Sequence, residues 1–205
     1  MMKTLIDNLR EDGVLHSDSI VNALAEVDRA DFVPQSFKNK AYEDIPLPIG
    51  RGQTISQPYT VIFMLEHLMV QSWNIVLEAG YGSGWQTALL ANLVGDKGHV
   101  YAFEIVPELC DMGKKNILKY PDLSSRVSLF CSSAEYGYME ASPFDRIIAA
   151  AEVGEVPSAW RAQLIVGGRM IYPQGNDLVL EVKKDEDSFK VERYPGFAFV
   201  PFIQQ

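Results

Sequence analysis

Three glycines and the acids that flank them carry the clearest chemical signal in this sequence of 205 residues. An apolar run at 75–79 leads into Gly80, Gly82 and Gly84, and a helix-like segment follows. Glycines let the backbone turn sharply and approach a ligand, and the free N–H groups at a helix start favour polar or anionic groups. The spacing Gly-x-Gly-x-Gly after Glu78 departs from the dinucleotide fingerprint and fits S-adenosylmethionine better. The alternative is a simple tight connection between strand and helix.

A second acid, Glu104, ends another apolar run at 99–104. A carboxylate at the tip of the second strand of a doubly wound sheet can accept hydrogen bonds from both ribose hydroxyls. A solvated strand end is the plainer interpretation. The order strand, glycines, helix, strand and acid favours the ribose role.

Alternating strands and helices are predicted around these residues. Strands are expected at 75–79, 99–104, 126–131, 143–151 and 169–173, with helices at 86–94, 107–119 and 158–164. This alternation requires a mostly parallel sheet that is covered on both faces. Two or three further strands from 177 onward, with FAFVPF at 197–202 as the last, predict an antiparallel edge. The expected fold class is α/β: a Rossmann-like, doubly wound, three-layer α/β/α sheet with an N-terminal helical cap and antiparallel C-terminal edge strands.

The length and the 47% hydrophobic content fit one domain with a sizeable core. We divide this domain, 1–205, into a helical cap with an active-site loop at 1–70, a donor-binding core at 71–175, and C-terminal strands at 176–205. Within the cap, residues 42–58 show turn chemistry without periodicity and are expected to form a long loop. Such a loop inside a compact domain is more often functional than idle.

The formal net charge of −9 argues against nucleic acid as a partner, because phosphate binding needs a basic surface. Cys110 and Cys131 lie in a predicted helix and a predicted strand without metal-ligand spacing, so we expect two free thiols and no metal site, with a disulfide or a catalytic role as the less favoured alternative. The N-terminal segment lacks the apolar region of a signal peptide, and no apolar run is long enough to span a bilayer. The expectation is a cytoplasmic monomer without membrane association.

Seven segments together resemble the protein-L-isoaspartate O-methyltransferase family. They are RADFVP at 29–34, AYEDIPLPIGRGQTISQPYTV at 41–61, VLEAGYGSGWQTALLA at 76–91, FEIVPEL at 103–109, PFDRII at 143–148, QLIVGGRMIYPQG at 163–175, and the closing VPF. The glycine motif is shared by many methyltransferases, whereas PLPIG-x-GQTIS is characteristic of this family. The resemblance implies methyl transfer from S-adenosylmethionine, with S-adenosylhomocysteine as product, to the free carboxylate of isoaspartyl residues in damaged proteins and peptides. The ester then promotes closure to a succinimide, which can reopen to normal aspartate.

The resemblance also assigns site residues. Ser56 is expected to orient the substrate carboxylate as the catalytic residue, on a mobile loop at 50–58 that covers the methyl donor. The residues expected to bind the donor are Thr54 and Ile55 in the pocket wall, Glu78, Gly80, Gly82 and Ser83 around the methionine portion, and Glu104 at the ribose.

One segment departs from the family pattern. Where the family usually has Gly-Asp-Gly after the third strand, with its Asp near the adenine amino group, this chain has Ser132, Ser133 and Ala134. Two hypotheses follow for the adenine end of the site. Either Glu135 reaches the adenine from further along the chain, or Ser133 makes a weaker contact beside Ala134.

The expected reaction needs no general base, because a carboxylate with a pKa of about 4 is already ionised at neutral pH. Two other functions remain open. One is a carboxyl O-methyltransferase of the same fold that acts on a specific peptide or a small acid. The other is a non-catalytic relative that binds a peptide, which the altered turn at 132–134 would favour.

Overall fold

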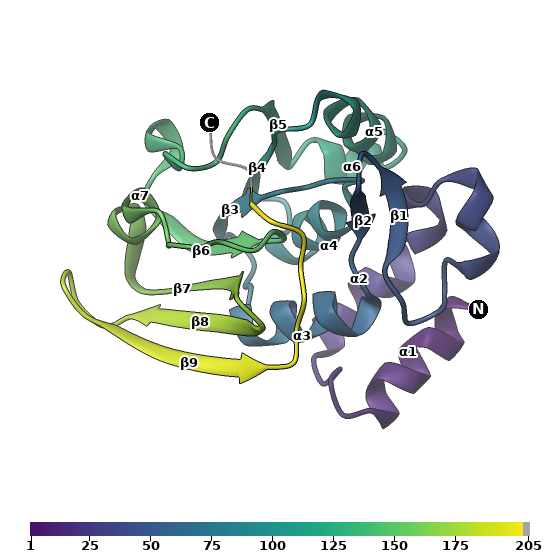
Figure 1. Cartoon of the computed structure of the whole chain (residues 1–205), viewed down its shortest axis with the longest axis horizontal. Coiled ribbons are helices and arrows are strands. Elements are labelled where there is room, and N and C mark those ends of the chain that lie inside the picture. The colour runs from purple at the N-terminus through teal and green to yellow at the C-terminus, as the bar shows by residue number, and fades with distance from the viewer. Residues whose placement is uncertain (203–205) are drawn as a thin grey trace.

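A seven-stranded sheet organises the chain, whose computed structural model describes residues 1–202 (Figure 1). Its strand order is β5-β4-β3-β6-β7-β8-β9. The strands are β3 (Ile75–Ala79), β4 (His99–Glu104), β5 (Val127–Cys131), β6 (Phe144–Ala149), β7 (Leu164–Gln174), β8 (Asp177–Lys183) and β9 (Phe189–Pro195). The pairs from β5 to β7 are parallel, and β8 and β9 join in antiparallel fashion. The predicted α/β class with an antiparallel edge is confirmed.

Helices cover the two faces of this sheet unequally. One face packs against α3 (Pro58–Leu68), α4 (Trp85–Val94) and α5 (Pro107–Ile117), with the short α6 (Pro121–Ser124) behind them. Among residues 1–202, the helical elements on the other face are α7 (Ser158–Ala162) and the 3₁₀ turn η3 (Met139–Ala141), and the core there includes the fully buried Trp160. Among the described residues, no helix has the length and apolar character that crossing a membrane requires.

Residues 2–40 form a helical layer beside α4 (Figure 1). It comprises α1 (Met2–Glu11), α2 (Asp18–Glu26) and the 3₁₀ turns η1 (Arg29–Phe32) and η2 (Gln35–Lys40). The stretch at 42–58 is not the loop that the sequence predicts, because β1 (Leu47–Gly50) and β2 (Gln53–Ile55) pair as an antiparallel hairpin within it. Hydrogen bonds between the backbones of two short strands stabilise this stretch, so it forms strands although its side chains show no apolar periodicity.

Two predictions for the C-terminal half are wrong in detail. The strand β7 begins at Leu164, ahead of the predicted turn, and Gly167 lies within it at a φ of 82°, where the register against β6 shifts. The run FAFVPF does not continue the antiparallel edge. It crosses the sheet ends instead and forms a single parallel bridge between Pro201 and Glu152. The last three residues of the predicted C-terminal strands lie outside the described part of the chain.

Candidate active site

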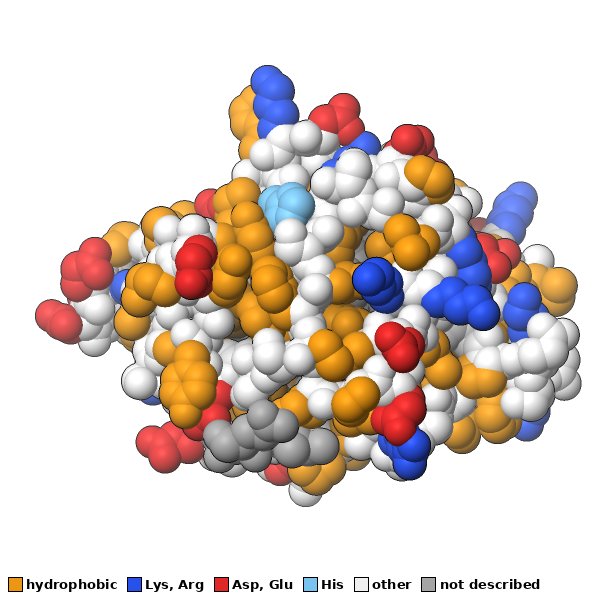
Figure 2. All heavy atoms as spheres, turned by 90° about the horizontal axis from the view of Figure 1, so that it is seen from above, with side chains coloured by type: hydrophobic (Ala, Val, Ile, Leu, Met, Phe, Trp, Pro, Cys, Tyr) orange, Lys and Arg blue, Asp and Glu red, His pale blue; other side chains and the backbone are white. Residues whose placement is uncertain are grey.

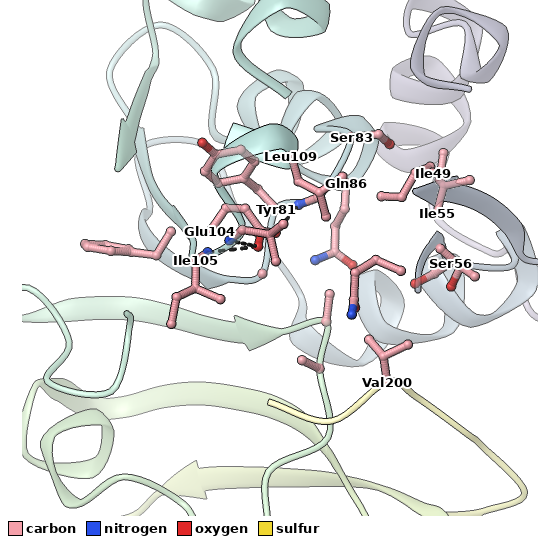
Figure 3. Close-up of a pocket in the computed structure, with 18 of the residues that line it drawn as sticks. Ile49, Ile55, Ser56, Tyr81, Ser83, Gln86, Glu104, Ile105, Leu109 and Val200 are labelled. Carbon is pink, nitrogen blue, oxygen red and sulfur yellow. Dashed lines mark hydrogen bonds between the residues drawn. The ribbon is translucent and has the colours of Figure 1, made fainter. Parts of the chain in front are cut away.

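A cavity opens where the carboxyl ends of β3 and β4 face the β1–β2 hairpin (Figure 3). Its empty volume is about 820 Å³, part of which is open to solvent. We call it the inner cavity. Its walls come from the hairpin, the glycine turn, the start of α4, the residues after β4, the turn at 132–134 and the C-terminal segment.

The glycine turn has the backbone conformation that its sequence predicts. Gly80, Gly82 and Gly84 adopt φ angles of 86°, 51° and 91°, which residues other than glycine rarely adopt. A Cβ on Gly82 would lie 3.2 Å from the side chain of Ile49, and one on Gly84 would lie 3.1 Å from Ile117. A side chain at either position would crowd these neighbours and strain the backbone, so glycine favours the close approach of the hairpin and α5 to the turn.

The Glu104 carboxylate binds backbone N–H groups of the glycine turn and of the residues after β4. Its Oε2 accepts a hydrogen bond from the Gly82 N–H at 2.9 Å, and its Oε1 accepts from the N–H groups of Ile105 and Val106 at 2.8 and 3.0 Å. The carboxylate lines the inner cavity although only 7% of the residue is exposed (Figure 3). A carboxylate offers about four acceptor positions, so one remains for a ligand hydroxyl.

Glu78 occupies a different position from the other candidate residues. It is fully buried on β3, behind the residues that line the inner cavity, and its Oε1 accepts a hydrogen bond from Gln86 at 2.9 Å. Its Oε2 and the nearby hydroxyl of Thr87 have no partner among the described residues. Burial raises the pKa of Glu78 to about 7, against smaller lowering effects from Thr87 and Gln86. Glu78 therefore reaches the cavity only through Gln86, which does line it.

The hairpin brings the candidate reaction residues to the opposite wall. Thr54, Ile55 and Ser56 all line the inner cavity, as do Gly80, Gly82 and Ser83 across from them. Figure 3 shows Ser56 and Ile55 on one side of Gln86, with Glu104 on its opposite side. The structure thus brings together the predicted residues from segments that are distant in the sequence.

The conformation of the turn after β5 bears on the two hypotheses for the adenine end, contact by Glu135 or by Ser133. Ser132, Ser133 and Ala134 line the inner cavity, whereas Glu135 does not. The Ser133 hydroxyl accepts a hydrogen bond from the Glu135 N–H at 3.2 Å, and the buried Oε2 of Glu135 has no partner among the described residues. This placement favours Ser133 over Glu135 as the residue that can contact a bound ligand.

The two cysteines are not free, which contradicts the sequence-based expectation. Cys110 on α5 and Cys131 at the end of β5 form a disulfide with an S–S distance of 2.08 Å. The pairing of β4 with β5 places Cys131 opposite Glu104, and α5 follows directly from β4. The crossover between adjacent parallel strands therefore brings together two cysteines that are 21 residues apart. The bond lies next to the turn that carries Ser132 to Ala134.

A second hollow adjoins the first, and sequence reasoning missed most of it. We call it the outer groove. It lies between α3 and the segment that follows β9, with an empty volume of about 1670 Å³ including open solvent. Aromatic side chains supply much of its wall: Tyr59, Phe63, Tyr194, Phe197 and Phe199. Phe63 packs edge-on against Tyr194 with ring centroids 5.1 Å apart.

The inner cavity and the outer groove share four residues: Thr54, Ser56, Ala150 and Val200. Ser56 therefore stands where the two hollows meet. The C-terminal segment reaches this junction because the Glu152 N–H donates to the Val200 carbonyl at 2.8 Å. Only the closing VPF run in the sequence points to this segment.

The parallel sheet, the glycine turn at the end of β3 and the acid at the end of β4 define an S-adenosylmethionine-dependent methyltransferase. The family model for "Protein-L-isoaspartate(D-aspartate) O-methyltransferase" matches residues 1–205. The chain belongs to this family.

Relatives named protein-L-isoaspartate O-methyltransferase agree with that placement. The one from Methanothrix thermoacetophila is 42% identical over 97% of this chain and 93% of its own length. The one from Staphylothermus marinus is 41% identical over 98% and 93%. A solved structure with the same name is 31% identical, with a TM-score of 0.89 over 98% of this chain and 65% of that chain.

A second solved structure supports the fold. It is a putative protein-L-isoaspartate O-methyltransferase from Plasmodium falciparum in complex with S-adenosyl-L-homocysteine. It is 24% identical and matches 99% of this chain and 98% of its own chain with a TM-score of 0.89.

Proposed function

We propose that this chain carries out its family's reaction at the junction of the two hollows, with the donor in the inner cavity and the acceptor in the outer groove. The reaction transfers a methyl group from S-adenosylmethionine to the free carboxylate of an L-isoaspartyl residue. The resulting ester initiates repair through a succinimide. The observation that carries the proposal is the position of Ser56, which lines both hollows.

The inner cavity fits the donor in chemistry. Glu104 offers its remaining carboxylate acceptor position to a ribose hydroxyl, and the glycine turn lets the backbone come close to the methionine portion. Apolar side chains, among them Ile55 and Leu109, line the rest of the wall, and Ser133 with Ala134 borders the adenine end. When bound, S-adenosylmethionine supplies a methyl group on a sulfonium that a nucleophile can take.

Ser56 orients the acceptor in this proposal. Its hydroxyl donates a hydrogen bond to one carboxylate oxygen of the isoaspartyl residue and leaves the other oxygen to attack the methyl carbon. No proton has to be removed, since the carboxylate is ionised near neutral pH. Rate acceleration then comes from proximity and orientation, which can contribute on the order of 7 to 11 kcal/mol.

The outer groove supplies the binding surface for the polypeptide around the reacting residue. Its aromatic wall can cover apolar parts of an extended segment, while Ser56 and Thr54 remain at its inner end. Thr54 and Ile55 complete the donor wall from the hairpin side. We also propose that, within the loop at 50–58, the part before Ser56 moves to admit and cover the donor, while hydrogen bonds to Arg29 and Asp44 hold Ser56 and Gln57 in place.

We further propose that residues 1–205 act as one catalytic domain, as a monomer in the cytoplasm, on proteins and peptides and not on nucleic acid. The net charge of −9 supports the exclusion of nucleic acid. On the face shown in Figure 2, basic side chains lie among acidic and hydrophobic ones. Light scattering at micromolar concentration tests the monomer, and a dimer mass would contradict it.

The test is methyl incorporation from labelled S-adenosylmethionine into two peptides that differ only in isoaspartate or aspartate at one position. We expect base-labile label in the isoaspartyl peptide alone. Ser56→Ala should lower kcat/KM by roughly 10- to 100-fold, since a hydrogen bond to a charged group contributes about 1.5 to 3 kcal/mol. Equal labelling of both peptides would indicate a less selective carboxyl methyltransferase. No labelling together with no donor binding would favour a peptide-binding relative.

A further inference from the structure

Arg29 is a buried cation close to the reaction site. Its exposed fraction is 0%, and it forms no ion pair with any carboxylate of residues 1–202. The guanidinium lies over the ring of Trp85, 5.2 Å from the ring centroid. Burial lowers the pKa of Arg29 to about 10, against a smaller opposing effect of Asp44. Burying a charge is costly unless hydrogen bonds compensate it.

Backbone carbonyls around the hairpin provide that compensation. Nη2 of Arg29 donates to the carbonyls of Ile45 and Ser56, both at 3.0 Å, and these residues stand just before β1 and just after β2. Nη1 donates to the Ala41 carbonyl at 2.8 Å and more weakly to that of Glu43 at 3.4 Å. One guanidinium therefore binds both ends of the hairpin and fixes the backbone carbonyl of Ser56.

Asp44 holds the residues that follow Ser56. Its Oδ1 accepts a hydrogen bond from the Tyr59 N–H at 2.7 Å, and its Oδ2 accepts from the side chain of Gln57 at 2.8 Å. Tyr59 lies in the first turn of α3, where backbone N–H groups lack partners within the helix. Arg29 and Asp44 thus restrain the Ser56 carbonyl and the residues that follow Ser56 in the chain.

We propose that Arg29 and Asp44 are positioning residues for methyl transfer, which hold Ser56 at the junction of the inner cavity and the outer groove. This inference rests on the proposed role of Ser56. Within residues 1–202, β1 and β2 pair with each other and not with the seven-stranded sheet, so no backbone ladder to that sheet fixes the residue after β2. Hydrogen bonds from a charged donor are about twice as strong as neutral ones, and they set the Ser56 backbone more firmly than hairpin pairing would.

A displaced Ser56 should slow the chemical step more than it weakens substrate binding. A misplacement of about 1 Å can cost on the order of 100-fold in rate. We expect Arg29→Lys to lower kcat for the isoaspartyl peptide at least 10-fold, since lysine cannot reach both hairpin ends with a planar fork. Asp44→Asn should lower kcat about 3- to 10-fold. KM and the donor Kd should each change less than 3-fold.

The matched control is Arg146→Lys. Arg146 also donates from its guanidinium to a backbone carbonyl, that of Met69, but it lies outside both hollows. We expect its kcat to stay within 2-fold of the parent. A comparable loss of kcat in this control would show that any arginine-to-lysine change in the fold impairs the enzyme, which would overturn the inference.

A double-mutant cycle with Ser56→Ala separates positioning from general stability. If Arg29 acts through Ser56, Arg29→Lys should change kcat less than 3-fold once Ser56 is alanine. Fully additive losses, or a donor Kd that rises as much as kcat falls, would overturn the inference. If Arg29→Lys does not fold by circular dichroism, Asp44→Asn in the same cycle decides. If Ser56→Ala alone has no effect, the proposed role of Ser56 fails first, independently of Arg29.

Discussion

The donor side and the acceptor side of the site are built in different ways. The donor side draws mainly on the ends of β3, β4 and β5, which are neighbours in the sheet and follow one another along the chain. The acceptor side combines the hairpin, α3 and the segment after β9, which are distant in the sequence. Neighbouring strand ends give short, recognisable motifs, whereas distant segments meet only after folding. The two sides should therefore fail separately when single residues are changed.

Glu104→Ala should have the largest effect and should act on the donor side alone. The substitution leaves the N–H groups of Gly82, Ile105 and Val106 without their acceptor and removes the proposed ribose contact. One charge-assisted hydrogen bond to the donor, of about 1.5 to 3 kcal/mol, is lost and the glycine turn loses its acceptor, so the donor Kd should rise more than 10-fold and up to about 150-fold. Calorimetric titration with S-adenosylhomocysteine measures this change.

The control for that prediction is Glu108→Ala, because Glu108 is an exposed acid on α5 that pairs with Arg51 on the surface. Its donor Kd should stay within about 2-fold, as surface ion pairs contribute little. A donor Kd that stays within 10-fold in Glu104→Ala would refute the ribose role and blur the distinction between the two sides.

The expectation of two free thiols on the donor side was wrong, because Cys110 and Cys131 form a disulfide. Removing this disulfide should have the next largest effect. In the chain-entropy view, a cross-link that closes a loop of this length stabilises the fold by about 3 kcal/mol. The double variant Cys110→Ser, Cys131→Ser should show that loss in urea denaturation. It should also weaken donor binding several-fold, because the turn at 132–134 loses its link to α5.

Reduction of the parent protein provides the matched measurement, since it breaks the bond without changing either side chain size. Thiol-treated parent and double variant should agree in both stability and donor Kd. Unchanged donor affinity in both would show that the disulfide supports the fold without shaping the adenine end of the site.

Much of the donor side could be predicted from the sequence, and the reasons are local. The strand at His99–Glu104 has its predicted limits, and the three glycines have the positive φ angles that their type permits. The disulfide could not be predicted, because it depends on β5 pairing beside β4. The path of Val200 over the inner cavity and the hydrogen bonds of Arg29 likewise depend on contacts between distant segments.

Glu78 lies in the core behind the donor side, where its ionisation should affect the stability of the fold. Its pKa rises from 4.5 to about 7 on folding, chiefly through burial. The folded protein then holds a proton that the unfolded chain releases, so this contribution to stability is full below pH 4.5 and is lost as the pH rises to about 7. The loss above pH 7 is on the order of 3 kcal/mol.

Glu78→Gln should remove that dependence and stabilise the donor-free protein at pH 8 by about 1 to 3 kcal/mol. The glutamine can still accept from Gln86, and its amide can donate toward the unpartnered hydroxyl of Thr87. Urea denaturation at pH 8 and pH 4.5 measures the difference, which should shrink toward zero at the lower pH. An equal difference at both pH values would mean that Glu78 does not titrate in this range.

The smallest predicted effects concern the adenine end, where this chain lacks the family's acid. Ser133→Ala should raise the donor Kd about 2- to 10-fold, because a neutral hydrogen bond contributes about 0.5 to 1.5 kcal/mol. Glu135→Ala should leave the donor Kd within 2-fold, since Glu135 does not line the inner cavity. A 10-fold or larger loss in Glu135→Ala would reverse the two assignments, because only a charged contact has that strength. The donor side would then extend beyond the strand ends, and its contrast with the acceptor side would be one of degree.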